Sequence, residues 1–105
     1  MKGTAMYWVV AVISVRILDV LRERFAREGI VRFTAAEVEV FEPDSDAATG
    51  KHAMRIEVAV NEEFLEPTLK VLEKLGSEGH DVSVHVGSIA DARRIRTGES
   101  GPEAI

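Results

Sequence analysis

The chain has 105 residues, of which 46% are hydrophobic and 30% charged, and these proportions predict one small folded domain over residues 1–105. Its formal net charge of −5 argues against a nucleic-acid partner, because a DNA or RNA binder needs a basic face. Cysteine is absent, which excludes disulfides and thiolate metal sites. The apolar run Met6–Ile13 is too short to cross a bilayer and lacks the flanks of a signal peptide, so we expect a cytoplasmic protein with no membrane insertion.

The first half of the chain predicts two strands around one helix. Residues 7–13 are aromatic and β-branched without any charge, which is typical of a central strand buried on both faces. Apolar residues then recur at helical spacing between Ser14, a possible cap, and Gly29, which ends the helix. A second strand is expected over residues 30–41. The polar residues 42–51 predict a turn-rich loop.

The second half predicts the same elements in the order strand, helix, strand. Residues 52–60 read as a strand, and Asn61 is expected to cap a helix that residues 76–79 close. Pro67 either kinks this helix or moves its start a few residues later. Alternation over residues 82–86 predicts the last strand.

The order βαββαβ is that of the ferredoxin-like α+β sandwich. Two helices should cover one face of a four-stranded antiparallel sheet. The other face must also bury apolar side chains, and a core this small gains stability from association. We therefore expect the chain to self-associate.

The end of the sequence, R-R-I-R-T-G-E-S-G-P-E-A-I over residues 93–105, carries the clearest functional signal. In an extended segment, Arg94 and Arg96 would project from the same side. Two guanidinium groups can then grip an oligophosphate, because each matches phosphate oxygens bidentately. The alternative is a solvated tail or a surface ion pair.

R-I-R-T-G-E followed by E-A-I resembles the end of PII signal-transduction proteins. Residues 29–38 are similar to the family segment G-I-x-G-x-T-x-x-E-V, and Leu18 with Asp19 matches a leucine and an acidic residue in its first helix. The resemblance covers most of the chain. It implies a cytoplasmic homotrimer, not an enzyme, that binds an adenine nucleotide between subunits and regulates a partner protein such as a transporter or metabolic enzyme.

The resemblance also assigns site residues. It brings Thr34 near the adenine ring, Phe41 to the base of the family's signalling loop (the T-loop, residues 42–51 here), and the arginines of the tail 94–105 to the phosphates. The full nucleotide site expected from it is Arg94, Arg96, Thr34, Phe41, Val12, Ala59, Gly79 and His80.

Several departures from the family qualify this reading. The loop 42–51 is shorter than the family's T-loop, and the glycine-rich loop at residues 77–82 carries Glu78 and Asp81 but no phosphate-binding lysine. Desolvating phosphate charge against carboxylates is unfavourable, so we expect AMP or ADP rather than ATP. The alternative is a ligand-free trimeric interaction module that has lost nucleotide binding.

Metal binding and catalysis have weaker candidates. His52, His80 and His85 do not have the spacing of a metal site. The loop acids Glu42, Asp44 and Asp46 alternate as in a calcium loop but lack its glycine and distal glutamate. We therefore expect no metal, although a metal-linked trimer similar to the CutA proteins is a third alternative. No nucleophile–base pair is visible.

Overall fold

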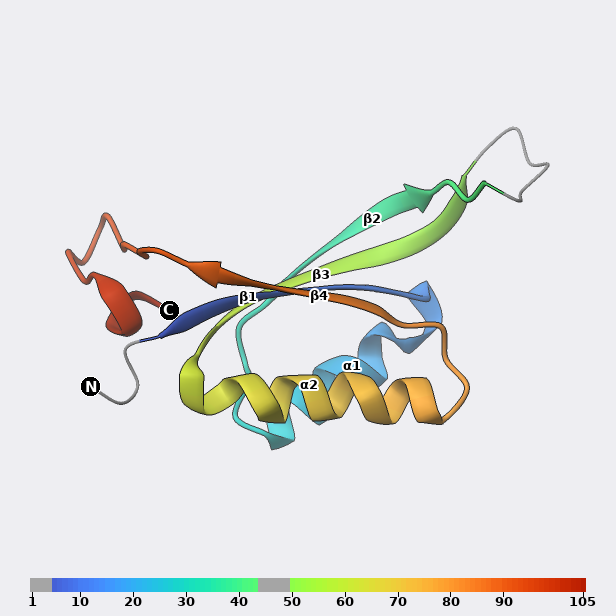
Figure 1. Cartoon of the computed structure of the whole chain (residues 1–105), viewed down its shortest axis with the longest axis horizontal. Helices are drawn as coiled ribbons and strands as arrows, with labels where there is room; N and C mark the ends of the chain where they lie inside the picture. The colour runs from blue at the N-terminus through green and yellow to red at the C-terminus, as the bar shows by residue number, and fades with distance from the viewer. Residues whose placement is uncertain (1–4, 44–49) are drawn as a thin grey trace.

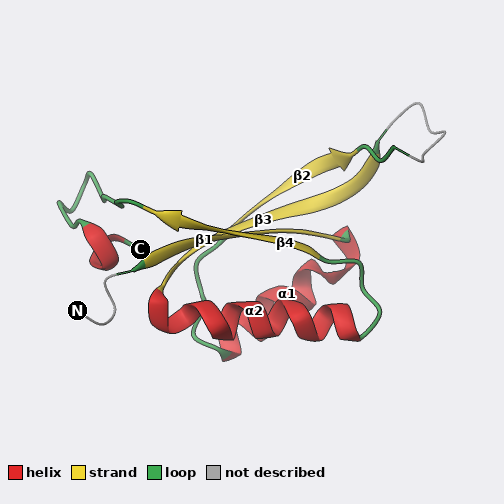
Figure 2. Ribbon diagram, viewed as in Figure 1, coloured by secondary structure: helices red, strands yellow, loops and turns green. Residues whose placement is uncertain are grey.

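The computed structural model describes residues 5–43 and 50–105. Its strands are β1 (Met6–Ile13), β2 (Thr34–Val40), β3 (Lys51–Asn61) and β4 (Ser83–Ile89). Its helices are α1 (Leu18–Arg27) and α2 (Glu62–Ser77), with short 3-10 turns η1 (Val15–Ile17) and η2 (Gly101–Ala104). The strands pair antiparallel in the order β2-β3-β1-β4. Both helices lie on one side of this sheet (Figures 1 and 2), so the ferredoxin-like prediction is confirmed.

The central strand β1 has two different faces. Val9, Ala11 and Ile13 point toward the helices and are 1% exposed. Alternate residues point to the opposite face, where Trp8 is 43% exposed and sits between Ala59 of β3 and Gly87 of β4. Within one chain, therefore, β1 is buried on one face only. In a single chain, the outer face of the sheet at Trp8 is therefore left partly exposed.

The core lies between the sheet and the two helices. Its fully buried side chains come from β1, both helices and the inner face of β3: Val9, Ile13, Leu21, Phe25, Ile56, Leu72 and Leu75. The helical spacing of the apolar residues produces this arrangement, because it directs one stripe of each helix at the sheet. None of the described helices is long and apolar enough to cross a membrane.

The second strand is shorter than the sequence pattern predicts. β2 begins at Thr34 and not at Ile30, because residues 30–33 carry the chain from the end of α1 to the sheet edge. In this connection Ile30 is buried, and Phe33 packs edge-on against Phe25 with ring centroids 5.6 Å apart. Val31 is 81% exposed. Ile30 and Phe33 thus close the core, and none of residues 30–33 pairs in the sheet.

The second helix begins directly at Glu62 and contains Pro67. The predicted alternative, in which Pro67 moves the start of this helix a few residues later, is therefore wrong. Asn61 occupies the N-cap position with extended backbone, but its side chain makes no capping bond. The last strand also runs further than predicted, to Ile89, because Met6 at the start of β1 provides a pairing partner for it.

Phe25 should be the most costly single truncation in the core. It is fully buried and contacts Phe33, so Phe25→Ala should lower the free energy of unfolding by about 3–5 kcal/mol. Urea unfolding at equal protein concentrations measures this loss. Val31→Ala is the control, because a side chain this exposed should change stability by less than about 0.5 kcal/mol. Equal effects of the two changes would contradict the assignment of the core.

Candidate ligand-binding cleft

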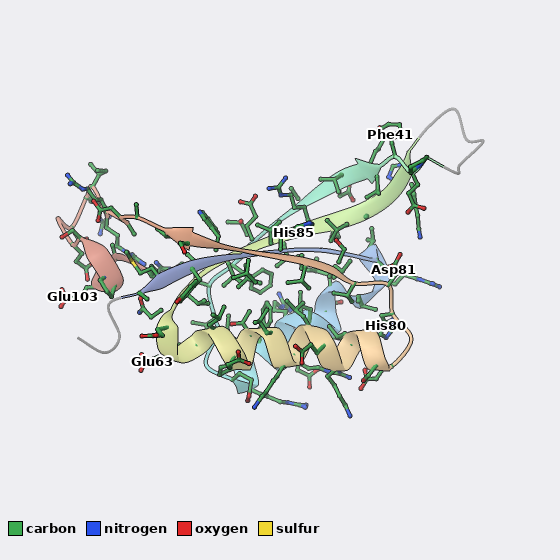
Figure 3. The ribbon with its side chains drawn as sticks, viewed as in Figure 1. Phe41, Glu63, His80, Asp81, His85 and Glu103 are labelled. Carbon is green, nitrogen blue, oxygen red and sulfur yellow. The ribbon has the colours of Figure 1, made fainter. Side chains whose placement is uncertain are left out.

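A cleft of about 830 Å³ opens where β1 ends, beside the base of the β2–β3 ribbon and the loop from α2 to β4. Figure 3 shows Phe41, His80 and Asp81 at this end of the molecule. The apolar part of the lining comes from Val12, Ile13, Ile17, Val20, Val40 and Ala53. The polar part comes from Ser14, Arg16, Glu42, Lys51, His52, His80, Asp81 and Ser83. Such a cleft can accept a flat apolar group and place charge at its rim.

Three of the predicted site residues meet in this cleft. Val12 lines it from the end of β1, and Gly79 and His80 line it from the loop after α2. Gly79 has a backbone φ of 95°, a conformation that glycine adopts without strain. The backbone of this loop can therefore turn sharply beside the cleft.

Phe41 lies next to the cleft without lining it. Its side chain is 70% exposed, and its neighbours Val40 and Glu42 both contribute to the lining. A Cβ built on Gly50 would stand 3.1 Å from the Phe41 Cζ atom, so the ring covers the position where the chain re-enters β3. Residues 44–49, which include the acids Asp44 and Asp46 of the calcium-like pattern, lie outside the described residues.

The remaining predicted residues do not reach the cleft. Thr34 starts β2 and donates a hydrogen bond from Oγ1 to the Glu57 carbonyl, 3.4 Å away. Ala59 lines a separate hollow of about 200 Å³. Arg94 and Arg96 follow β4, which pairs with Met6 at the start of β1, whereas the cleft is at its end. The eight residues of β1 span about 23 Å, so one protomer cannot bring these arginines to its own cleft.

The arginine segment is a hairpin, so the expectation of an extended segment is wrong. Arg93 forms an antiparallel bridge with Ser100, and residues 95–97 are a turn. Gly98, with φ of 81°, donates its N–H to the Arg94 carbonyl at 2.8 Å. Glycine permits this left-handed conformation and so reverses the chain. Arg94 is half-buried at the base of the turn, and Arg96 is exposed within it.

The cleft contains a cation that sequence reasoning missed. Arg16 lies in η1, directly after β1, and lines the cleft. It forms no ion pair with any residue in the described ranges. Lys51 on the opposite wall is paired only loosely, with its Nζ 3.9 Å from the Asp81 Oδ2. No motif marks Arg16; only its place at the end of a central strand could have indicated it.

An ion pair ties the loop after α2 to the first helix. Arg24 Nη1 of α1 lies 2.8 Å from the Glu78 Oε1, at the helix end that precedes Gly79. The Arg24 guanidinium holds the pKa of the Glu78 carboxyl below its ordinary value of 4.5. At neutral pH the pair therefore stays ionised and helps to hold this wall of the cleft.

This pair predicts a specific acid sensitivity. Because the pKa of Glu78 is lowered by folding, its stabilisation is present above the ordinary value and is lost as the pH falls through the folded one. Glu78→Gln should lower the melting temperature at pH 7, and the difference from wild type should shrink toward pH 3. Glu73→Gln, on the exposed face of α2, is the control. A difference that does not change with pH would contradict the ion pair.

The histidines do not form a metal centre. Among residues 5–43 and 50–105, no three His, Asp or Glu side chains gather closely enough to hold a metal ion. His85 lies on β4 beside Val10, on the outer face of the sheet, whereas His52 and His80 line the cleft.

Solved structures share this fold. Bacillus subtilis GlnK in its ATP complex matches with a TM-score of 0.85 and 21% identity over 98% of this chain and 100% of that one. Arabidopsis thaliana PII bound to citrate matches with a TM-score of 0.82 and 22% identity over 97% of this chain and 94% of that one. The ferredoxin-like fold of PII proteins is therefore the fold of this chain.

Sequence relatives define the family. No family model matches the chain. The chain is 34% identical over 116 residues to nitrogen regulatory protein GlnK1 of Methanosarcina mazei, covering 96% of this chain and 98% of that protein. It is 30% identical over 109 residues to nitrogen regulatory protein P-II of Rhizobium etli, covering 92% and 97%. The chain belongs to the PII nitrogen regulatory protein family, as its closing motif indicated.

Proposed function

We propose that this protein is a cytoplasmic, non-enzymatic sensor that binds an adenine nucleotide between the subunits of a homotrimer and regulates a partner protein, such as a transporter or a metabolic enzyme. One observation carries the proposal. The cleft and the arginine hairpin lie at opposite ends of β1, so a ligand that needs both must bridge two copies of the chain. The GlnK–ATP complex among the structures of the same fold supports a nucleotide as that ligand.

The open face of the sheet supports self-association. Trp8 is 43% exposed on this face, and the sheet edges β2 and β4 are exposed along most of their length. An aromatic side chain of this size gains much stability when a second copy covers it. In a single copy of the chain, Trp8 stays partly exposed and this stabilisation is not gained.

The charges around the cleft favour a nucleotide with few phosphates. Glu42 and Asp81 add negative charge to the lining, and Arg16 and Lys51 add positive charge. A long phosphate chain would have to lie against the two carboxylates, which is unfavourable. We therefore infer a preference for AMP or ADP over ATP.

A ligand-free trimeric interaction module is the second candidate. The observation that favours it is the pairing of Lys51 with Asp81 across the cleft, because this contact uses one cation that an anionic ligand would need. In such a protein the trimer would remain, and the surfaces around Phe41 would act without nucleotide.

Loss of the two arginines should weaken nucleotide binding. Each hydrogen bond to a charged group contributes about 1.5–3 kcal/mol, so Arg94→Ala combined with Arg96→Ala should lower ADP affinity at least tenfold, by roughly 1.4 kcal/mol or more. Calorimetric titration with AMP, ADP and ATP measures this loss. Arg22→Ala, an exposed change on α1, is the control. Unchanged ADP binding in the double variant would remove the phosphate argument; no binding by an intact wild-type trimer would favour the second candidate.

Charge on the open face should prevent assembly. Trp8→Lys places an ammonium group where we expect a second copy to pack, and burying that charge without a partner is costly. The wild type should sediment with the mass of a trimer and the variant with a smaller mass. Glu73→Lys, on the exposed face of α2, should keep the trimer mass. A monomeric wild type, or a Trp8→Lys trimer, would overturn the proposed assembly.

A further inference from the structure

The residues after the arginine hairpin fold back onto the domain. Gly101 donates its N–H to the Ala92 carbonyl at 2.8 Å, and its φ of 67° permits the turn that leads into η2. Residues 101–105, called the hook below, thus return to the end of the sheet where β1 starts (Figure 1). Ile105 lines the small hollow together with Phe64 and Val60. The hook is a packed part of the fold.

The hook holds one nitrogen of a predicted ligand residue. Arg94 Nε donates to the Ala104 carbonyl at 3.2 Å, and the Arg94 main-chain N–H donates to the Glu99 carbonyl at 2.9 Å. The two terminal Nη groups of Arg94 have no hydrogen-bond or ion-pair partner among the described residues. A guanidinium held at Nε keeps its end-on pair of Nη groups for two phosphate oxygens. The contact to Ala104 therefore orients Arg94 without occupying that pair.

The neighbouring arginines are held differently. The Arg93 Nε donates to the Asp91 Oδ2 at 2.8 Å, so that side chain is committed to an internal ion pair. Arg96 is exposed in the turn 95–97 and has no side-chain partner within the described ranges. Arg93 is thus anchored at Nε by a carboxylate that already offsets its charge, whereas Arg94 is anchored at Nε by a neutral carbonyl and keeps its full positive charge for a phosphate.

Asn61 connects the hook to the body of the domain. Its Nδ2 donates to the Pro102 carbonyl at 3.2 Å, across 41 residues of sequence. Asn61 stands at the N-cap of α2, where asparagine usually bonds the helix backbone, yet here it makes no capping bond. Its donor is used on the hook instead. The anchor joins the β3–α2 junction, which is fixed by the core, to the segment that orients Arg94.

We propose that Asn61 and the hook are positioning elements that hold Arg94 ready for the phosphate of the ligand. The inference rests on the proposed function, because it assigns how one of its binding residues is oriented. A preorganised arginine loses less conformational freedom when it binds. Arg94 should consequently contribute more to phosphate affinity than Arg96 does.

The test uses the full chain in its assembled state. Asn61→Leu is close to asparagine in size, adds no charge and removes the donor to the Pro102 carbonyl. We expect it to weaken ADP binding about five- to tenfold, which corresponds to one hydrogen bond of ordinary strength, and to leave adenosine binding unchanged. A loosened fold would weaken both ligands equally, so the difference between ADP and adenosine reports orientation of the phosphate group.

The matched control is Glu103→Gln, which changes an exposed side chain of the hook but keeps both carbonyls, and it should not weaken ADP binding. Truncation after Gly101 removes the Ala104 and Pro102 carbonyls together and should weaken ADP binding at least as much as Asn61→Leu. Arg94→Ala should cancel the effect of Asn61→Leu, because a positioning residue acts only through the group that it positions.

Hydrogen exchange of residues 92–105, measured without ligand, separates the possible failures. Faster exchange in Asn61→Leu with undiminished ADP affinity would overturn the positioning role and leave the proposed function intact. Equal exchange and equal affinity in the truncated and full chains would overturn the hook itself. No ADP binding by the wild type would instead overturn the proposed function, and the positioning of Arg94 for phosphate with it.

Discussion

The pairing of β1 with β3 on one side and β4 on the other organises the rest of this molecule. Side chains alternate along a strand, so this pairing sends Val9, Ala11 and Ile13 into the core and leaves Trp8 outside. It also determines what stands at each end of the sheet. The cleft forms where β1 ends, and the arginine hairpin forms beside its start.

This separation gives the protomer two incomplete binding surfaces. The cleft has an apolar lining and a rim of mixed charge, whereas the hollow at the hairpin is lined by Arg93 and Arg94 with Ile95 as its one apolar side chain. In the proposed function, neither would form a complete nucleotide site alone. In the proposed trimer, the sheet edges and the open face that remain uncovered in one chain would bring the end of one copy to the start of the next.

The two surfaces also differ in how firmly they are held. The Lys51–Asp81 pair across the cleft is exposed and long, so it contributes little stability and responds to nearby charge, whereas the half-buried Arg24–Glu78 pair holds the loop beside the cleft. The Arg94 side chain, in contrast, is held by the main-chain carbonyl of Ala104 in the hook, whose charge does not change with pH. In the proposed function, an anionic ligand would therefore disturb the Lys51–Asp81 pair while Arg94 keeps its orientation.

Much of the fold was predictable because it depends on local patterns. Apolar spacing indicated both helices, and alternation indicated the sheet, whose order followed from βαββαβ. Residues 30–33 were assigned to a strand because Val31, Phe33 and Ala35 alternate with other residues. Such alternation cannot distinguish a residue that pairs in the sheet from one that closes the core beneath it. Val12, Gly79 and His80 were brought together only by family resemblance, since their separation in sequence carries no distance information.

The sequence by itself determined the element order, the apolar central strand and the family, because these depend on residue type, spacing and a closing motif. The tertiary structure decided that Arg94 lies at the base of a hairpin, that Asn61 anchors the hook and that Arg16 lines the cleft. Each of these depends on contacts between distant segments. Such contacts arise only when β1 pairs with both neighbours and fixes which elements meet at each end of the sheet.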